Sequence, residues 1–344
     1  NLDDVVVIGY QVVKRRDLTG SVASVNSKQL SVAPVANVAQ ALQGKLPGVN
    51  IISQDGRPDA EINIRVRGGG SISQSNEPLV LIDGVPGTIS DIPSEQVESI
   101  DVLKDASSTA IYGARGANGV ILITTKGAKE GKIRISYNGY AKVNTPVKYL
   151  EGMSPYDYVA YTWANADANS SDFADPFAKL FGLGKYGDIN RYKNVDMYDI
   201  QKKIYGTSFS HSHDLSISAG NENTRVLFSF NYNDENGMKV NSYQKRANVA
   251  LKLDQKLAKG LRMALDLRYT DVTAMGYEGT GSRSGSTLSS AYRFRPISTE
   301  TINQLGNIAA LREGAIAQYG KASLWDTYDP YELIKDYEPL RQRQ

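Results

Sequence analysis

The chain has no cysteine among its 344 residues, and it has only two histidines. The missing cysteines exclude disulfide frameworks, thiolate zinc sites and cysteine nucleophiles. His211 and His213 alternate along one face of an expected strand, but no third ligand accompanies them, so we expect no metal site. No Ser/His/Asp set, paired-carboxylate motif or metal cluster stands out, so the sequence indicates neither an enzyme nor a bound cofactor.

Long hydrophobic runs and an excess of one charge are also missing. A membrane-spanning helix needs about 20 apolar residues, whereas the longest apolar stretches, Val5–Ile8 and Leu79–Ile82, have the length of a strand. The 39 basic and 37 acidic residues leave a net charge of +2, without the basic footprint of a nucleic-acid-binding protein. A soluble protein and a membrane β-barrel both fit this composition. The chain begins at Asn1 without a signal peptide, so we expect a mature or trimmed form.

The first half of the chain, to about Gly127, has the pattern of a compact mixed α/β unit. Residues 36–43 have helical character, and Gly44 is an end signal for that helix. Asp83 and Gly84 form a strong turn signal directly after an apolar strand. The sequence predicts short strands at residues 49–52, 62–66, 79–82, 99–103 and 120–124.

The second half changes to strict alternation of apolar and polar residues. Each segment approaches the ~10 residues of a strand in a membrane barrel. An ordinary antiparallel sheet, with one face toward a core, alternates in the same way and is the alternative. The five segments with this period are residues 133–138, 214–219, 225–233, 246–254 and 261–270.

Connection lengths favour the membrane barrel over the ordinary sheet. Short connections follow the second and fourth segments, and longer ones follow the first, third and fifth, as periplasmic turns and extracellular loops do. From Asp271 onward we expect no clear strand, and residues 341–344 have the pattern of a loop. Five strands leave two open edges, each with unpaired backbone groups that cost several kcal/mol in hydrocarbon. We therefore expect most of the barrel to lie outside this sequence.

Ordered sequence blocks run across the first 127 residues, at 3–10, 14–22, 41–49, 64–68, 81–86, 98–107, 110–121 and 124–127. Together these blocks resemble the SusC/RagA type of TonB-dependent outer-membrane transporters. The resemblance implies an α+β plug domain followed by an incomplete antiparallel transmembrane β-barrel, which has 22 strands in the family. It divides the chain into a TonB box at residues 1–10, a plug domain at 11–127, and the first barrel strands and extracellular loops at 128–344.

The resemblance implies that the first ten residues contain the TonB-binding segment. The segment is apolar and extended, which suits addition of a strand to a partner through main-chain hydrogen bonds. The implied partner is the periplasmic end of TonB, and the alternative is a first strand packed within the plug. The segment comprises Asp4, Val5, Val6, Val7, Ile8, Gly9 and Tyr10.

Two arginines and one polar loop are further candidate sites. Arg65 and Arg67 project from one face of a strand, and an unpaired buried charge is costly. The resemblance implies that they pair with acidic residues on the barrel wall as a plug–barrel lock; the alternative is a surface charge pair. A phosphate-binding motif is absent from the glycine-rich loop that follows. We expect this loop to face the ligand through Gly69, Gly70, Ser71, Ser73, Gln74 and Asn76.

The long connection after the first barrel segment contains a helix start. Ser154 stands at the capping position, Pro155 at the first position and Asp157 at the third. Aromatic residues nearby, including Trp163, are equally suited to gripping a ligand and to packing the loop against itself.

By resemblance, the function is TonB-dependent import of a large nutrient, an oligosaccharide or a peptide. The implied location is the outer membrane of a Gram-negative, Bacteroidetes-like bacterium, with the lipid bilayer around the barrel. A surface lipoprotein of SusD type is the implied lid. The alternatives are a TonB-dependent signalling receptor and a receptor for siderophores or cobalamin.

Overall fold

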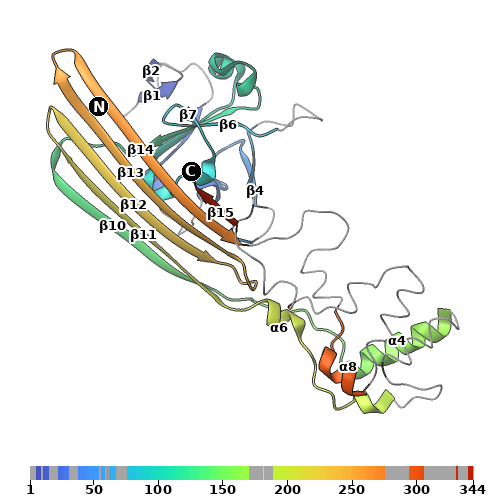
Figure 1. The fold of residues 1–344 in the computed structure, drawn as a ribbon. Coiled ribbons are helices and arrows are strands. Elements are labelled where there is room, and N and C mark those ends of the chain that lie inside the picture. Colours follow the sequence, from blue (N-terminus) through green and yellow to red (C-terminus); the bar gives the residue numbers. More distant parts are fainter. Residues whose placement is uncertain are drawn as a thin grey trace.

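The chain forms a compact N-terminal domain, a long-stranded sheet and a group of helices at one end of that sheet (Figure 1). The computed structural model describes residues 5–8, 11–14, 22–30, 38–53, 56–58, 60, 62–66, 76–169, 181, 189–275, 294–305, 331 and 340–343. Within those ranges, no helix is both long enough and apolar enough to cross a membrane.

The N-terminal domain is built on a five-stranded sheet of order β3-β8-β9-β6-β7. Only β6 and β9 run parallel; the other neighbours are antiparallel. The five strands are β3 (Val22–Asn26), β6 (Leu79–Ile82), β7 (Val85–Pro86), β8 (Val97–Leu103) and β9 (Val120–Thr125). A separate pair joins β4 (Asn50–Ser53) to β5 (Ile62–Arg65). The five predicted strands of this half are therefore confirmed.

Short helices cover this sheet and complete the core. Val38, Leu42, Ile100 and Ile121 are among the buried residues of the main cluster. The Asp105 carboxylate caps α3 by accepting a hydrogen bond from the Ser108 amide at 2.7 Å. The helical segments are α1 (Ser27–Leu30), α2 (Val38–Leu42), α3 (Ala106–Thr109), η2 (Ile89–Asp91), η3 (Ser94–Gln96) and η4 (Ala110–Gly116).

The predicted turn at Asp83 and Gly84 is confirmed as the two-residue connection between β6 and β7. Both residues have positive φ, 47° and 88°, as a type I′ hairpin turn requires. Glycine adopts this conformation freely, and aspartate is one of the few other residues that tolerate it. The turn therefore places a carboxylate at the end of the sheet, where it accepts hydrogen bonds from Thr125.

The long-stranded sheet consists of antiparallel strands in chain order, β10 to β15. All five predicted segments are confirmed, and the strands are longer than the segments. At 13 to 16 residues each, β10 to β14 exceed the five or six residues that are usual in globular proteins by about twofold. They are β10 (Gly131–Asn144), β11 (Ser208–Gly220), β12 (Thr224–Asn236), β13 (Tyr243–Ala258) and β14 (Leu261–Met275).

A sixth strand corrects the expectation that nothing beyond Asp271 is a strand. β14 continues to Met275, and β15 (Leu340–Arg343) pairs with it, Arg343 lying opposite Asp271. The prediction of a loop at residues 341–344 was wrong because Leu340 is the only apolar residue of β15. The strands of this half were predicted from an alternation of apolar and polar residues, which β15 lacks. β15 forms through its pairing with the edge of β14.

Connection lengths alternate along the long-stranded sheet. The short connections at residues 221–223 and 259–260 join strands at one end of the sheet, and β10 and β11, β12 and β13, and β14 and β15 are joined at the other end. The helices α4 (Pro155–Asn169), α6 (Ile200–Ile204) and α8 (Thr299–Leu305) lie at this second end (Figure 1). The predicted cap of α4 is confirmed, because the Ser154 hydroxyl accepts a hydrogen bond from the Asp157 amide at 3.1 Å.

The first and third long connections pack on each other through a hydrophobic core of their own. Val159, Tyr192, Ile297 and Ile302 are buried in it, and Trp163 packs against it. The Tyr198 amide also donates to the Pro296 carbonyl at 3.0 Å. These connections therefore form one structural unit, hereafter the loop unit, and Trp163 serves its packing.

Tyr192 is the most informative residue for testing the loop unit. Its hydroxyl donates to the Phe181 carbonyl at 2.7 Å, and burial raises the pKa of Tyr192 to about 12. Tyr192→Phe should cost about 1–3 kcal/mol, because a buried acceptor loses its partner. We expect faster hydrogen exchange in both α4 and α8, since the two connections share this core. Tyr156→Phe, at a ring that lies under Lys193, is the control, and equal effects of both variants would contradict the shared core.

Candidate functional site

The two faces of the long-stranded sheet show burial opposite to that of a soluble sheet. The face toward the N-terminal domain is polar and buried: Ser210, Asn231 and Arg246 are 0%, 1% and 3% exposed. The opposite face is apolar and exposed, with Ile135 at 69% and Leu267 at 53%. An ordinary sheet buries its apolar face, whereas a membrane barrel turns that face toward lipid. This pattern decides between the two alternatives that the sequence left open.

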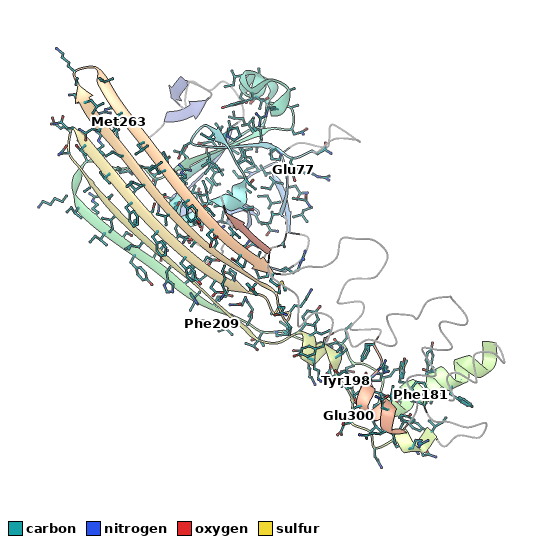
Figure 2. All side chains as sticks on the ribbon, in the orientation of Figure 1. Glu77, Phe181, Tyr198, Phe209, Met263 and Glu300 are labelled. Carbon is teal, nitrogen blue, oxygen red and sulfur yellow. The ribbon has the colours of Figure 1, made fainter. Side chains whose placement is uncertain are left out.

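Strand register shows where the apolar face ends. One row runs across five strands as Tyr137, Leu215, Phe230, Val249 and Tyr269, and it is apolar or aromatic throughout. Four residues nearer the helices, the matching row is Ala141, His211, Asp234, Lys245 and Thr273, which is mainly polar. Figure 2 shows Phe209 toward the helical end of this face and Met263 toward the tight turns. The change from apolar to polar marks one boundary of the lipid-facing band.

The two histidines lie at this boundary. Their ring centroids are 5.2 Å apart, and the Tyr137 hydroxyl lies 2.6 Å from Nδ1 of His213. No group of three or more potential metal ligands occurs in the part of the chain that the structure describes. His211 and His213 therefore belong to an aromatic cluster on the outward face.

Asp83 connects the N-terminal domain to the long-stranded sheet. The Lys252 ammonium on β13 donates to its carboxylate at 2.9 Å, and the Arg268 guanidinium on β14 donates to it as well. Within its own domain, Asp83 accepts the Thr125 amide at 2.9 Å and the Thr125 hydroxyl at 2.6 Å. Asp266 supplies a second negative charge to balance the two cations. Its carboxylate lies 2.6 Å from the Arg268 guanidinium and 3.5 Å from the Lys252 ammonium. We call these five residues the Asp83 network.

The Asp83 carboxylate is held in its charged form by this network. Burial by itself would raise its pKa, but the hydrogen bonds from Thr125 and the charge of Lys252 outweigh burial. The pKa of Asp83 is consequently lower than usual. A second connection is made farther along β13, where Arg246 donates to the Ser90 carbonyl at 2.7 Å. Charged groups therefore hold the N-terminal domain against the sheet. When water enters this contact, each charged group can replace its lost partner with hydrogen bonds to water.

Of the two arginines predicted as a plug–barrel lock, the structure describes only Arg65. Arg65 is exposed on β5, and among the described residues it forms no ion pair. Arg67 lies outside the described residues, so a lock at Arg65 and Arg67 stays a prediction. Sequence reasoning missed Asp83, although its turn was recognised, because its partners are 169 and 185 residues away along the chain.

The predicted ligand-facing loop is described at one position only. Asn76 is half-buried just before β6. Gly69, Gly70, Ser71, Ser73 and Gln74 lie outside the described residues, and their role stays a prediction.

The predicted TonB-binding segment forms a strand near the tight-turn end. β1 (Val5–Ile8) pairs antiparallel with β2 (Gln11–Lys14), Val7 lying opposite Val12. This pair is separate from the five-stranded sheet, and Figure 1 draws it at the end of the molecule opposite α4 and α8. Asp4, Gly9 and Tyr10 lie outside the described residues, and binding to TonB stays a prediction.

Comparison with known proteins links these features to one family. A family model described as the TonB-dependent receptor plug domain matches residues 14–120. A TonB-dependent receptor of Formosa agariphila is 41% identical over 273 residues, which cover 76% of this chain and 26% of that receptor. The TonB-dependent receptor SusC of Bacteroides thetaiotaomicron is 37% identical over 263 residues, which cover 73% of this chain and 24% of SusC.

A solved structure has the same architecture. The RagAB peptide importer in its open-open state matches with a TM-score of 0.70 and 27% sequence identity, over 84% of this chain and 34% of that chain. The chain spans about a quarter of the length of the two curated relatives above.

Proposed function

Because this chain belongs to the SusC/RagA type of TonB-dependent outer-membrane transporters, we propose that it gates the import of a large nutrient. In this proposal, residues 11–127 are the plug and residues 128–344 supply strands and extracellular loops of the barrel. The long-stranded sheet is then the barrel wall. One observation supports this assignment most: the wall turns its polar face to the plug and fastens it there through Asp83.

Opening requires force on the plug from the periplasm. β1 lies near the tight-turn end, where periplasmic turns belong. One edge of β1 pairs with β2, so the other edge is the place where a strand of TonB would add. Tension on this segment reaches the plug, and the Asp83 network is one set of contacts that has to separate. Its charged partners regain hydrogen bonds to water as they part, which lowers the cost of release.

The loop unit and the substrate belong to the outer side of this gate. A surface lipoprotein of SusD type would close over the barrel from the side of the long connections. The RagAB peptide importer supports a peptide as the substrate, and an oligosaccharide is the other substrate that the family resemblance implies. The names of these two proteins and of the Formosa agariphila relative describe receptors and an importer rather than enzymes.

Gentle purification of the full-length protein from native outer membranes tests this function. We expect mass spectrometry to find a surface lipoprotein in stoichiometric amount, with peptide or glycan retained in the cavity. The same preparation from cells that lack TonB should retain the lipoprotein, because lid binding needs no energy. A solitary barrel that carries a metal chelate would contradict the proposal and indicate a siderophore-type receptor.

A further inference from the structure

A row of polar side chains crosses the inner face of the wall between β10 and β12. The Lys142 ammonium lies 2.6 Å from the Glu235 carboxylate, and the Tyr140 hydroxyl donates to the same carboxylate at 3.3 Å. Asn233 in turn donates to the Tyr140 hydroxyl at 3.4 Å. We call these four residues the polar bar.

Small residues on the intervening strand make this bar possible. β11 lies between β10 and β12, and it places Ser210 opposite Lys142 and Ser212 opposite Tyr140. Both serines are buried. Larger side chains at these positions would stand between the two strands, so the serines allow Lys142 and Tyr140 to reach across β11.

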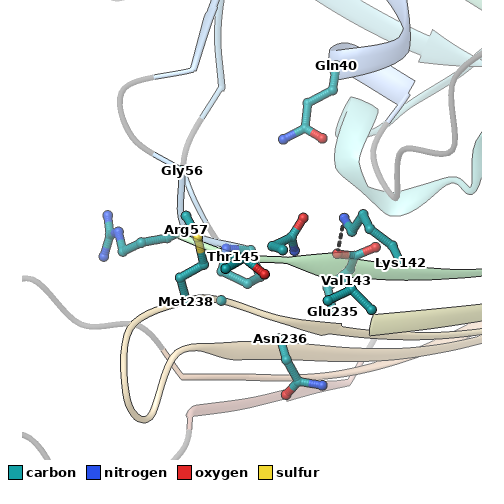
Figure 3. Close-up of a pocket in the computed structure, with 12 residues that line it drawn as sticks. Gln40, Gly56, Arg57, Lys142, Val143, Thr145, Glu235, Asn236 and Met238 are labelled. Atoms are coloured by element: carbon teal, nitrogen blue, oxygen red, sulfur yellow. Dashed lines mark hydrogen bonds and ion pairs between the residues drawn. The ribbon is translucent and has the colours of Figure 1, made fainter. Parts of the chain in front are cut away.

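An upper pocket of about 450 Å³ lies on the side of the bar that faces the long connections (Figure 3). Lys142, Asn144 and Glu235 line it from the wall, and Gln40 and Arg57 line it from the plug. Plug and wall touch at its rim, because a Cβ at Gly237 would lie 3.0 Å from Cδ of Pro58. This volume falls within the ~300–1,000 Å³ of typical ligand sites.

A lower pocket of about 470 Å³ lies on the other side of the bar, nearer the tight turns. Asn138, Tyr140 and Asp214 line it from the wall, and Glu95 and Lys126 line it from the plug. Tyr140 belongs both to the bar and to this lining. Two polar pockets of similar size therefore follow each other along the seam between plug and wall, with the bar between them.

We infer that this seam is the path of a peptide through the transporter, with the upper pocket as a resting site and the bar as a gate. The inference rests on the proposed import function and names the substrate class. Among the described residues that line the upper pocket, none carries an aromatic ring on which a sugar would stack, whereas Tyr137 and Tyr140 line the lower pocket. Arg57 supplies positive charge to the upper pocket. Lys142 and Glu235 pair with each other while the bar is closed, and as they part they present one charge of each sign, which matches the two ends of a peptide. The Gln40 and Asn144 amides suit its main chain.

Site-specific photocrosslinking in the full-length transporter tests this path. A benzoylphenylalanine replaces Asn144 in the upper pocket, Asn138 in the lower pocket, or Ile135 on the outward face as the control. Cells receive a biotinylated peptide mixture and, separately, a biotinylated oligosaccharide mixture. We expect the probe at 144 to capture peptide with or without TonB. The probe at 138 should capture peptide only when TonB is present. The probe at 135 should capture no peptide, with or without TonB.

A second variant examines the bar itself. Tyr140→Phe removes the hydroxyl that joins Asn233 to Glu235 in the bar and changes no residue that lines the upper pocket, so peptide capture at 138 should rise in the presence of TonB while capture at 144 stays the same. Equal capture at 138 and 135, while TonB-dependent peptide uptake continues, would overturn the seam path and leave the import function standing. Capture of oligosaccharide in place of peptide at 144 would overturn the substrate class. Absence of TonB-dependent uptake for both mixtures would instead contradict the import function.

Discussion

Replacing Asp83 with asparagine should loosen the plug in the full-length transporter. The variant keeps the shape of the side chain and removes the charge that Lys252 and Arg268 share. A hydrogen bond to a charged group contributes about 1.5–3 kcal/mol to stability. Because the Asp83 network is partly exposed, we expect a loss near the lower end of this range. A loss of about 1.4 kcal/mol makes the released plug roughly tenfold more frequent. Entry of a large antibiotic through the outer membrane, which the closed plug excludes, measures this change.

Asp254→Asn is the matched control for this variant. Asp254 lies on β13, the same strand as Lys252, and pairs with Arg262 at 3.5 Å within the wall. The control removes the same charge without touching the plug, so antibiotic entry should not change. In a double-mutant cycle, Asp83→Asn and Lys252→Gln should be non-additive, because they remove the same contact. Additive effects, or equal effects of Asp83→Asn and Asp254→Asn, would show that the Asp83 network does not hold the plug.

The acid response of the plug gives an independent measure of the same contact. The pKa of Asp83 is lower in the folded protein than its ordinary value. Its contribution to stability is therefore fully present above the ordinary pKa of about 4 and is lost as the pH falls through the lowered value. Plug retention in the wild type should weaken in that acid range, and the Asp83→Asn variant should lack this step.

A proline in place of Val7 should abolish TonB-dependent uptake and leave ligand binding at the outer side unchanged. Proline has no backbone N–H and restricts φ, whereas addition of a TonB strand depends on main-chain hydrogen bonds. We expect uptake to fall to the level measured in cells that lack TonB. Uptake of labelled substrate and equilibrium binding to the purified protein separate energy coupling from recognition.

Two variants distinguish the roles that the β1–β2 hairpin could have. Val7→Ala preserves the backbone, so it should support nearly normal uptake if main-chain pairing dominates. Val12→Pro disturbs β2 opposite Val7 and leaves residues 4–10 intact, so a loss of uptake there would show that the hairpin itself prepares the segment. Normal uptake by Val7→Pro would contradict the assignment of the TonB-binding segment.

Local sequence patterns determined the architecture of this chain. The alternation of apolar and polar residues assigned the faces of β10 to β14, since successive side chains of a strand point to opposite faces. The Asp83 turn and the Ser154 cap were also predictable, because each depends on neighbouring residues. β15 escaped prediction because a strand of polar residues forms only through its partner.

Tertiary structure alone decided which groups hold the plug against the wall. Any of several charged residues could have paired across this interface, and the lock expected at Arg65 and Arg67 stays a prediction. The sequence did not point to Asp83, because only the strand register and the packing of the two parts bring Lys252 and Arg268 level with its turn. The loop unit and the two pockets depend in the same way on segments far apart in the chain. Contacts of this kind follow from packing between elements, and no local pattern encodes them.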